Sequence, residues 1–242
     1  MYGGSIMMNK LILAAFAACL SGAALADYLE VREFTLAARG VDTVSIESGA
    51  GSLDVRGVPG TSEITVTATI EVPGRNDARA RKAIASDMVL TFEKDSDRAE
   101  LKALFDEGWS WGDSPHIHLE VRMPEGLHLE IDDGSGSIDI GNVRGDIMLE
   151  DGSGSLNMDE VGGKVEIDDG SGSITVSGVG GDLSIKDGSG SISVKDVAGS
   201  VTVDDGSGGI DVRDVEQDLI IVDDGSGGLD FSNIGGRVQE ES

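Results

Sequence analysis

The chain has 242 residues, with 45 acidic and 18 basic side chains and a formal net charge of −27 at pH 7. Charge of this sign repels nucleic acid and anionic lipid, so the composition excludes a nucleic-acid-binding protein and favours divalent cations or basic surfaces as partners. The single cysteine, Cys19, excludes a disulfide within the chain.

The first 26 residues have the pattern of a secretory signal peptide. Lys10 precedes an apolar run, Leu11 to Leu20, and Ala24-Leu25-Ala26 forms a small-residue cleavage site. Because this run is too short to span a bilayer, we expect no transmembrane span and an exported product, located in the periplasm, on the outer surface or outside the cell. Phe16-Ala17-Ala18-Cys19 loosely resembles a lipoprotein cleavage box, so a lipid anchor at Cys19 is the alternative.

Residues 27–126 form a divergent N-terminal part, which we expect to cap a repetitive second half. Ser48 to Val58 matches the turn and strand of the later repeats, and Ile64 and Val66 are expected to continue this divergent coil into a second strand. After Pro73-Gly74, the sequence predicts a short helix and two strands. Their expected ranges are Asn76 to Ala85, Met88 to Lys94 and Arg98 to Phe105.

Two groups of side chains in the N-terminal part could make contacts beyond their own segment. The predicted helix is basic, and its charges either lie against the acidic repeats or face solvent. Trp109 and Trp111 are the only tryptophans, and we expect them to pack in the cap, with a contact surface for a ligand or partner as the alternative.

The three histidines of the chain are His116, His118 and His128. His116 and His118 share one face of a predicted strand, and a turn at Pro124-Glu125-Gly126 could bring His128 back toward them, together with Glu120 and Glu130. Imidazole and carboxylate ligands suit zinc or copper, so a metal site is one hypothesis. The alternative is that these side chains face solvent on strands whose apolar residues point inward.

Residues 127–238 are a regular repeat, followed by the acidic tail 239–242. Asp-Gly-Ser-Gly occurs six times, at spacings of 18, 18, 18, 18 and 19 residues. Apolar residues between these turns alternate with polar ones and fall into five columns, which is typical of short β-strands that stack in register. The first column is Ile138, Leu156, Ile174, Ile192, Ile210 and Leu229. We therefore predict an all-β protein, a parallel β-solenoid of about 18 residues per coil.

Two other β architectures are compatible with parts of this pattern. Asp-Gly between alternating apolar runs is also a hairpin signal, but hairpins do not require five preserved columns. A left-handed hexapeptide helix would need apolar positions every six residues, so a right-handed path is favoured. Solenoid ends expose unpaired strands. We expect the N-terminal part to cover one end, and Phe231 with the acidic tail to protect the other.

The repeated turn aspartates form the candidate binding site. Stacking places equivalent residues about 4.8 Å apart, so these carboxylates form a column. Its members are Asp133, Asp151, Asp169, Asp187, Asp205 and Asp224. A second acidic column lies beside it and is interrupted by Lys186; its acids are Asp132, Glu150, Asp168, Asp204 and Asp223.

Two explanations of the turn column remain open. In one, each aspartate, Asp133 included, accepts backbone N–H groups of its own turn, while Asp132 and Asp139 face outward. In the other, calcium binds between the coils. The calcium β-roll repeat differs in spacing and in residue order, so calcium is a possible ligand and no other cofactor is expected.

The sequence does not favour an enzyme. The serines sit in repeated turns without a distinct histidine partner, and no set of nucleophile, base and orienting residue can be assembled from single positions. Arg144-Gly145-Asp146 spells an integrin-type tripeptide, but it occupies a turn position that Gly162-Gly163-Lys164 fills in the next repeat. We interpret it as turn composition.

The order of segments resembles that of a known family. A signal peptide, the strand pair Leu119-Glu120-Val121-Arg122-Met123-Pro124-Glu125-Gly126-Leu127-His128-Leu129 and Gly-rich coils of the form G-S-I-D-I-x-x-V-x-G-D-I are similar to the bacterial "putative adhesin" family, domain of unknown function 4097, with its LiaG-like and YvlB-like proteins. The resemblance covers about residues 40–238 and implies an exported or surface β-solenoid with an adhesion or envelope-stress association. It implies no catalytic residues. We expect a non-enzymatic protein that presents an acidic surface to a protein or glycan of the cell envelope, with a calcium-stabilised envelope module as the alternative.

Overall fold

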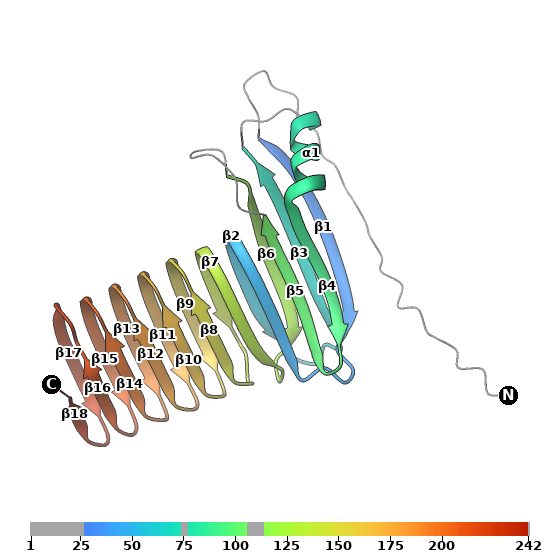
Figure 1. Cartoon of the computed structure of the whole chain (residues 1–242). Helices are drawn as coiled ribbons and strands as arrows, with labels where there is room; N and C mark the ends of the chain where they lie inside the picture. Colours follow the sequence, from blue (N-terminus) through green and yellow to red (C-terminus); the bar gives the residue numbers. More distant parts are fainter. Residues whose placement is uncertain (1–26, 74–76, 106–113, 242) are drawn as a thin grey trace.

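The computed structural model describes residues 27–73, 77–105 and 114–241, and Figure 1 shows them as one continuous β-structure with a single helix on one side. All the strands belong to one 18-stranded sheet. The sequence prediction of an all-β solenoid is confirmed. The described helix is too short to cross a membrane.

The N-terminal part contains long strands that pair in both directions. Its elements are β1 (Tyr28–Ala37), β2 (Thr43–Val58), β3 (Glu63–Val72), α1 (Asp77–Asp87), β4 (Met88–Asp95), β5 (Arg98–Phe105) and β6 (His116–Pro124). The strand β3 lies between β1 and β6 and is antiparallel to both, and β4 is antiparallel to β5. The strand β2 runs parallel to β5 over its first half and to β6 over its second half.

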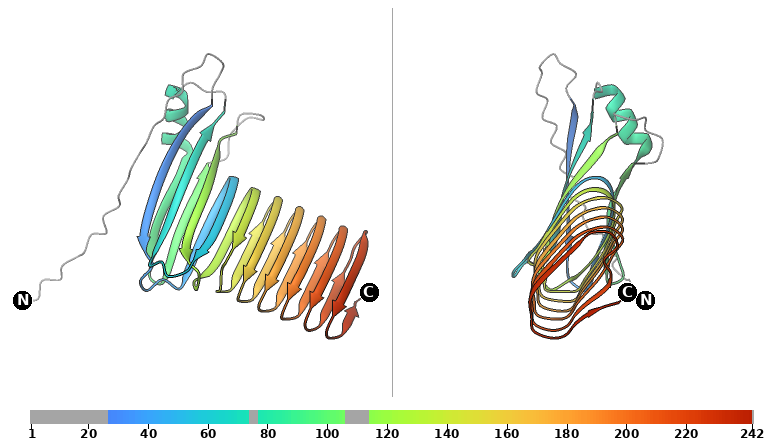
Figure 2. Two further views of the ribbon diagram at one scale, coloured as in Figure 1. Left: turned by 180° about the vertical axis from the view of Figure 1, so that it is seen from behind. Right: turned by 90° about the vertical axis from the view of Figure 1, so that its left-hand side faces the viewer.

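The regular coils consist of two short strands each. Their elements are β7 (His128–Gly141), β8 (Ile147–Asp151), β9 (Gly154–Val161), β10 (Val165–Asp169), β11 (Gly172–Val179), β12 (Leu183–Asp187), β13 (Gly190–Val197), β14 (Val201–Asp205), β15 (Gly208–Val215), β16 (Leu219–Asp223), β17 (Gly228–Ile234) and β18 (Val238–Glu240). Each strand pairs in parallel with the equivalent strand of the next coil, so Ile174 lies opposite Leu156 and Ile192. Figure 2 shows the coils end-on as flattened, superimposed loops.

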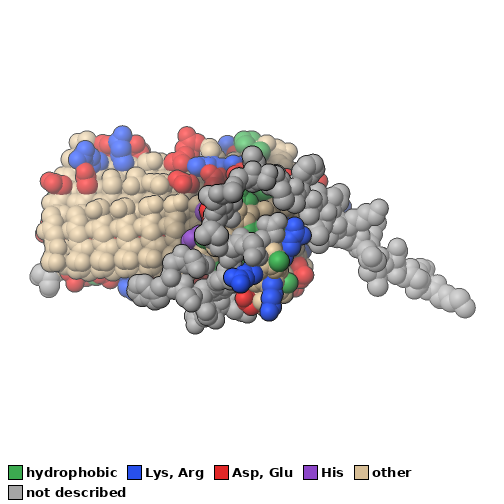
Figure 3. Space-filling model, turned by 90° about the horizontal axis from the view of Figure 1, so that it is seen from above, with side chains coloured by type: hydrophobic (Ala, Val, Ile, Leu, Met, Phe, Trp, Pro, Cys, Tyr) green, Lys and Arg blue, Asp and Glu red, His purple; other side chains and the backbone are tan. Residues whose placement is uncertain are grey.

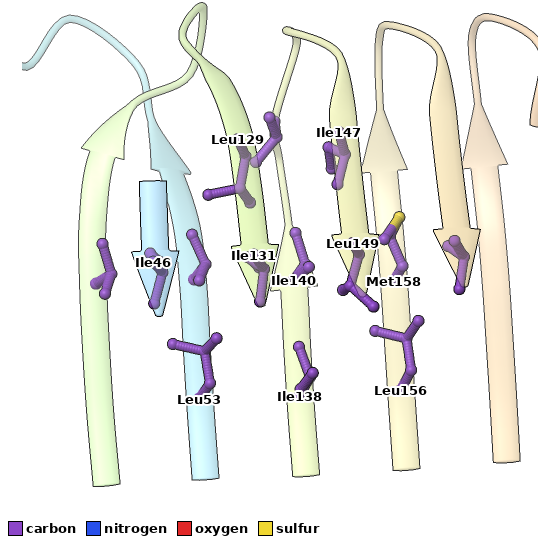
Figure 4. Close-up of a cluster of buried hydrophobic side chains, with 14 of the residues drawn as sticks. Ile46, Leu53, Leu129, Ile131, Ile138, Ile140, Ile147, Leu149, Leu156 and Met158 are labelled. Carbon is purple, nitrogen blue, oxygen red and sulfur yellow. The ribbon is translucent and has the colours of Figure 1, made fainter. Parts of the chain in front are cut away.

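The core follows from the alternation of side chains along these strands. In β8 the residues Ile147, Leu149 and Asp151 are buried and the residues between them are exposed. The predicted columns lie inside as far as Leu219 and Ile221, before the last coil, and Figure 4 shows Leu53, Ile138 and Leu156 in a row across β2, β7 and β9. Burial of one such side chain contributes roughly 1.5–3 kcal/mol, and because each column continues into the next coil, the coils stabilise one another.

The divergent coil is confirmed in part. The strand β2 matches β7 residue for residue on both sides of the turn, with Ser48 opposite Asp133 and Leu53 opposite Ile138. The expectation that Ile64 and Val66 continue this coil is wrong. The chain reverses at Pro59-Gly60, so β3 runs antiparallel to its neighbours and joins the cap.

The two predicted strands after the helix are confirmed as β4 and β5, and the helix begins one residue later and ends two residues later than expected. The helix contacts β4 and buries Ala80 and Ile84, and Arg81 lies over the ring of Tyr28, 5.7 Å from its centroid. The basic helix therefore sits on the cap, at the far side of β2 from the regular coils (Figure 1). Trp109 and Trp111 lie outside the described residues.

The two ends of the solenoid differ. The strands β5 and β6 pair with the outer edge of β2, so the N-terminal part covers that end as predicted. At the other end β18 adds to β16. Phe231 is 41% exposed and Val238 is 39% exposed. The expectation that Phe231 and the tail shield this end is therefore wrong, because both belong to the last coil itself.

Candidate functional site

The turn aspartates form a buried column inside the coils. Each one lies on the inward face of its strand, where the alternation also places the aliphatic side chains; Asp133 lies within β7, and the others end short strands. The five buried members are Asp133, Asp151, Asp169, Asp187 and Asp205, with exposed fractions of 0–5%. They lie opposite one another in consecutive coils. The predicted column is therefore present, and it lies inside the solenoid.

One carboxylate oxygen of most members closes its own turn. The Oδ1 atoms of Asp151, Asp169, Asp187 and Asp205 accept the backbone N–H of the serine two residues later, at 3.0–3.1 Å. The predicted Asx-turn is confirmed at these four positions. At Asp133 the Asx-turn prediction is wrong, because the Oδ1 atom of Asp133 instead accepts a hydrogen bond from the hydroxyl of Ser48 on β2. Ser48 replaces the aspartate in the divergent coil and caps the column.

The second oxygen of most members has no partner. The Oδ2 atoms of Asp133, Asp151, Asp187 and Asp205 are buried and accept no hydrogen bond. Burial raises the pKa of Asp133, Asp151 and Asp187 to about 6 and raises that of Asp169 and Asp205 in the same direction. Nearby carboxylates add to the rise, because a like charge disfavours ionisation. The aspartates of the column therefore remain protonated to a higher pH than surface aspartates do.

The glycine after each turn serine is required by close approach of neighbouring coils. Gly172 has φ +153°, and a Cβ there would lie 1.7 Å from the carbonyl oxygen of Gly154. No side chain fits such a contact. The repeated Gly-Ser-Gly therefore lets the coils stack directly, and Figure 3 shows one long edge of the coils as a regular uncharged array with acidic and basic side chains along its margins.

The sixth predicted member, Asp224, does not belong to the buried column. The last repeat has 19 residues, and the register between β14 and β16 shifts so that Asp204 lies opposite Asp223 and Val222 is extra. Asp224 is exposed, so the buried column ends at Asp205. The prediction of six equivalent sites is corrected to five.

The second acidic column faces solvent, as predicted. Asp132, Glu150 and Asp168 are exposed, and Lys186 lies 3.2 Å from the carboxylate of Asp168. Asp139 is half-buried on the other face of the coil. These acids are available to an external partner, in contrast to the turn aspartates.

The histidines do not form the cluster that the sequence suggested. His118 accepts from the backbone N–H of Ser52 and lies 3.5 Å from Glu71, whereas His128 lies 3.5 Å from Asp146. His118 lies beside Ser52, just after the turn in the middle of β2, and His128 lies opposite Thr43 at the start of β2. The hypothesis of a shared site with Glu120 and Glu130 is wrong, because the strands place the rings at opposite edges of the coil.

The Arg144-Gly145-Asp146 tripeptide has a structural role in its turn. The carboxylate of Asp146 accepts the backbone N–H of Lys164 at 2.9 Å, and two coils further on the carboxylate of Asp182 accepts the N–H of Ser200 at 2.8 Å. Arg144 lies 3.2 Å from Glu125. The tripeptide therefore lies in a turn of the repeat, as its column position predicted.

Two features of the site were not predicted from the sequence. Ser48 was not recognised as the cap of the aspartate column, although its alignment with Asp133 was available. At the corner opposite the Asp-Gly-Ser-Gly turn, Glu160, Asp196 and Asp214 adopt positive φ angles of 54–57°. Only the backbone shows that these residues share one conformation.

The donor set for a metal ion is limited. Within residues 27–73, 77–105 and 114–241, no three histidine, cysteine or acidic side chains are arranged to hold a metal ion. Two consecutive aspartates of the column could supply two carboxylates to an ion between them, whereas Ca²⁺ takes 6–8 oxygen ligands. A calcium site in the column would need further oxygen ligands from backbone or water.

Comparison with known proteins gives likeness in structure only. No protein-family model and no curated protein matches the chain. Structural similarity links it to a "putative cell adhesion protein" from Clostridium sporogenes, at 12% identity and TM-score 0.36, covering 88% of this chain and 99% of that one. A "putative lipid binding protein" from Parabacteroides distasonis has 11% identity and a TM-score of 0.43, and the match covers 88% of this chain and 97% of that one. A "putative adhesin" from Bacteroides fragilis has 12% identity and a TM-score of 0.37, and the match covers 88% of this chain and 96% of that one. At these values the likeness carries no argument about binding.

Proposed function

We propose that this chain is an exported, non-enzymatic β-solenoid of adhesin type that binds a protein or glycan of the cell envelope through its acidic surface. The observation that carries this proposal is the stacking of exposed acids in rows. Asp132, Glu150 and Asp168 follow one another in register on exposed positions. Rows of like charge about 4.8 Å apart present a repeated anionic pattern to a basic partner.

The test uses the column that contains Asp139, Asp211 and Asp230. These acids share one outward column with Thr175 and Ser193. Binding of the exported protein to envelope fractions is measured by co-sedimentation, with and without a calcium chelator. Replacement of the three acids by lysine is expected to weaken binding at least tenfold, whereas Thr175→Ala with Ser193→Ala leaves it unchanged. Failure of the unmodified protein to bind any envelope or host fraction contradicts the proposal.

The second candidate function is a calcium-stabilised envelope module. It is favoured by one observation, the four unpartnered Oδ2 atoms in the aspartate column. Specific binding predicts that millimolar calcium raises the melting temperature more than the same ionic strength of sodium chloride does. It also predicts that Asp187→Asn abolishes that difference. Equal shifts with both salts contradict the calcium function and leave the adhesin proposal intact.

A further inference from the structure

A cavity lies in the N-terminal part, where two layers of strands are not joined. The strands β1, β3 and β6 form one layer, and β4 and β5 form the other. On one side β2 joins the layers, because it pairs with β5 over its first half and with β6 over its second half. On the other side, within the described residues, no pairing joins β1 with β4. Figure 1 shows α1 beside the upper parts of these two strands.

The cavity is bordered by β1, α1 and β4 and has a volume of about 490 Å³. That volume lies within the usual range of ligand sites, ~300–1,000 Å³. We call it the cap cavity. It lies at the far side of β2 from the regular coils, so it is separate from the aspartate column and from the exposed acidic rows (Figure 1).

One wall of the cap cavity is apolar and accessible. The strand β4 is at the edge of its layer, so side chains from both of its faces border the cavity. Met88 and Leu90 are half-buried, and Val89 is 38% exposed. Ala85 on α1 is exposed, and its single methyl group leaves space where a longer side chain would fill it. These side chains can therefore contact an apolar ligand, which the closed core of the protein cannot.

The other wall carries two arginine side chains, Arg32 and Arg81, together with Glu30. The Nε atom of Arg32 donates to one oxygen of Glu30 at 2.9 Å, and the hydroxyl of Tyr28 donates to the other at 3.0 Å. Arg81 lies over the ring of Tyr28, 5.7 Å from its centroid. The four side chains thus hold one another in place, and two guanidinium groups stand against a single carboxylate. A guanidinium group has five donors and binds carboxylates through two of them, so this wall favours an anionic group.

The negative net charge of the chain does not exclude an anion at this position. Charges in salt solution act over about 8 Å at physiological ionic strength. The regular coils, which carry most of the excess acids, lie beyond β2 (Figure 1). Among the described residues that line the cap cavity, Glu30 is the one acid, and it is paired with Arg32. The local charge therefore decides which head group binds.

We propose that the cap cavity binds a single-chain anionic amphiphile of the fatty-acid class, with its carboxylate at Arg32 and Arg81 and its hydrocarbon chain along β4. With about 30 Å³ for each heavy atom, the volume of a water molecule in the liquid, the 14 heavy atoms of dodecanoate need about 420 Å³. This fits the volume of about 490 Å³. A small anion leaves the apolar wall uncovered, and a cationic amphiphile is repelled by the arginines. The inference goes beyond the proposed function and uses a different part of the molecule.

The experiment measures binding of dodecanoate to the full exported chain by isothermal titration calorimetry, below the critical micelle concentration of dodecanoate. Octanoate tests the apolar wall. Each buried methylene group strengthens binding by about fourfold, so we expect octanoate to bind at least tenfold more weakly. Dodecyltrimethylammonium has the same chain with a cationic head and tests the arginines. We expect it to bind at least tenfold more weakly than dodecanoate.

The arginine variant combines Arg32→Gln with Arg81→Gln. The matched control combines Arg79→Gln with Lys82→Gln, which removes two exposed bases of the same helix that do not line the cap cavity. Both variants change the net charge equally. We expect dodecanoate to bind at least tenfold more weakly to the arginine variant and within twofold of the original strength to the control.

A second variant fills the cap cavity without changing its charge. Ala85 is exposed on α1, so Ala85→Trp places a large side chain in the cavity and leaves the buried face of the helix intact. We expect the same tenfold loss of dodecanoate binding. Circular dichroism melting confirms that each variant is folded.

Four results would overturn the inference. Three are equal binding of dodecanoate and dodecyltrimethylammonium, equal weakening in the arginine variant and its control, and undiminished binding to Ala85→Trp. The fourth is binding to anionic phospholipid vesicles without binding of monomeric dodecanoate, because the partner would then be a membrane surface.

Co-sedimentation with envelope fractions, measured on the same proteins, separates this inference from the proposed function. We expect the arginine variant and Ala85→Trp to bind envelope fractions like the unmodified chain. If the unmodified chain binds envelope fractions but not dodecanoate, only the cap cavity is contradicted. If it binds dodecanoate but no envelope or host fraction, only the proposed function is contradicted.

Discussion

The N-terminal part and the regular coils bury one face of their β-strands in different ways. In the N-terminal part, strands of up to 16 residues pair in both directions, and Phe34 packs edge-to-face on Phe92 with ring centroids 6.5 Å apart. In the coils, strands mostly of 5 and 8 residues pair only with parallel neighbours one coil away. In the N-terminal part the strands pair with one another within that part, whereas each coil is stabilised by the equivalent strands of the coils next to it.

The two regions also differ in what they enclose. Among the described residues, the buried acids are the five aspartates of the column, all in the regular coils, while Ser48 is the buried polar residue of the N-terminal part. The coils therefore combine an apolar core with groups that resist ionisation. The stability of the coils should therefore change with steric changes at the turns and with pH. The stability of the N-terminal part should be less sensitive to both.

The largest expected effect comes from a single methyl group at a stacked turn. Gly172→Ala places a Cβ 1.7 Å from the carbonyl oxygen of Gly154, at a φ of +153° that L-residues rarely adopt. The coils must separate there, so we expect a loss of more than about 3 kcal/mol in the free energy of unfolding. Urea unfolding measures it.

The matched change in the N-terminal part is Gly126→Ala, where an added Cβ meets nothing within 4 Å. We expect its unfolding midpoint to equal that of the original chain. Similar losses at both positions would show that the coils do not stack as tightly as the turn geometry requires.

The second effect is on pH dependence, and it is expected in the coils. Burial raises the pKa of Asp133, Asp151 and Asp187 from 3.8 to about 6. A carboxyl with a raised folded-state pKa contributes stability that is complete below its unfolded pKa and is lost as the pH rises through about 6. We therefore expect hydrogen-exchange protection of the coils to be higher at pH 5 than at pH 8, with little change in β1 and β3.

The control for this pH effect is Asp187→Asn. Its side-chain oxygen can still accept the N–H of Ser189, and its neutral amide places no charge beside the carboxylates of Asp169 and Asp205. We expect stabilisation of about 1 kcal/mol at pH 8 and a smaller difference between the two pH values. Asp168→Asn, at an exposed position, tests whether general charge repulsion is responsible. If both variants flatten the pH response equally, the buried column is not its source.

The repeat made much of this structure predictable. An 18-residue period with preserved apolar columns requires parallel stacking, so Ile174 could be placed opposite Leu156 without any other information. The inward position of Asp151 followed from the same alternation but was obscured by its charge, because a carboxylate in a turn suggests solvent. The antiparallel path of β3 was not predictable, since it is decided by the reversal at Pro59-Gly60 and by pairing with β1 and β6.

The shared backbone conformation at the corners opposite the Asp-Gly-Ser-Gly turns could not be predicted for a related reason. Glu160, Asp196 and Asp214 share no residue type with Gly178 or Asn233, and only their common positive φ shows that they occupy one position. Similarly, the 19-residue spacing before Asp224 signalled an irregularity, but the sequence did not show that Val222 would be the extra residue. The register of a strand decides which residues join a column. At an irregular coil this register is set by the pairing of the strands and cannot be read from the spacing alone.

The smallest expected effect is at the junction of the two regions. Arg98 on β5 donates through both terminal nitrogens to Glu130 on β7, spanning β2 between them, and this lowers the pKa of Glu130. Both side chains are more than one third exposed, at 35% and 41%, so the pair should contribute about 0.5–1 kcal/mol. Arg98→Met should lower the unfolding free energy by that amount at pH 7.

The pH dependence of this junction has the opposite sign to that of the coils. A lowered folded-state pKa contributes stability that is present above the unfolded pKa and is lost as the pH falls through the folded pKa. The difference between Arg98→Met and the original chain should therefore shrink toward pH 3, and urea unfolding at pH 7 and pH 3 measures it. A loss above about 2 kcal/mol at pH 7 would mean that charge holds the cap on the coils. A loss within the expected range leaves that role to the backbone pairing of β2 with β7 and to the columns that continue through it.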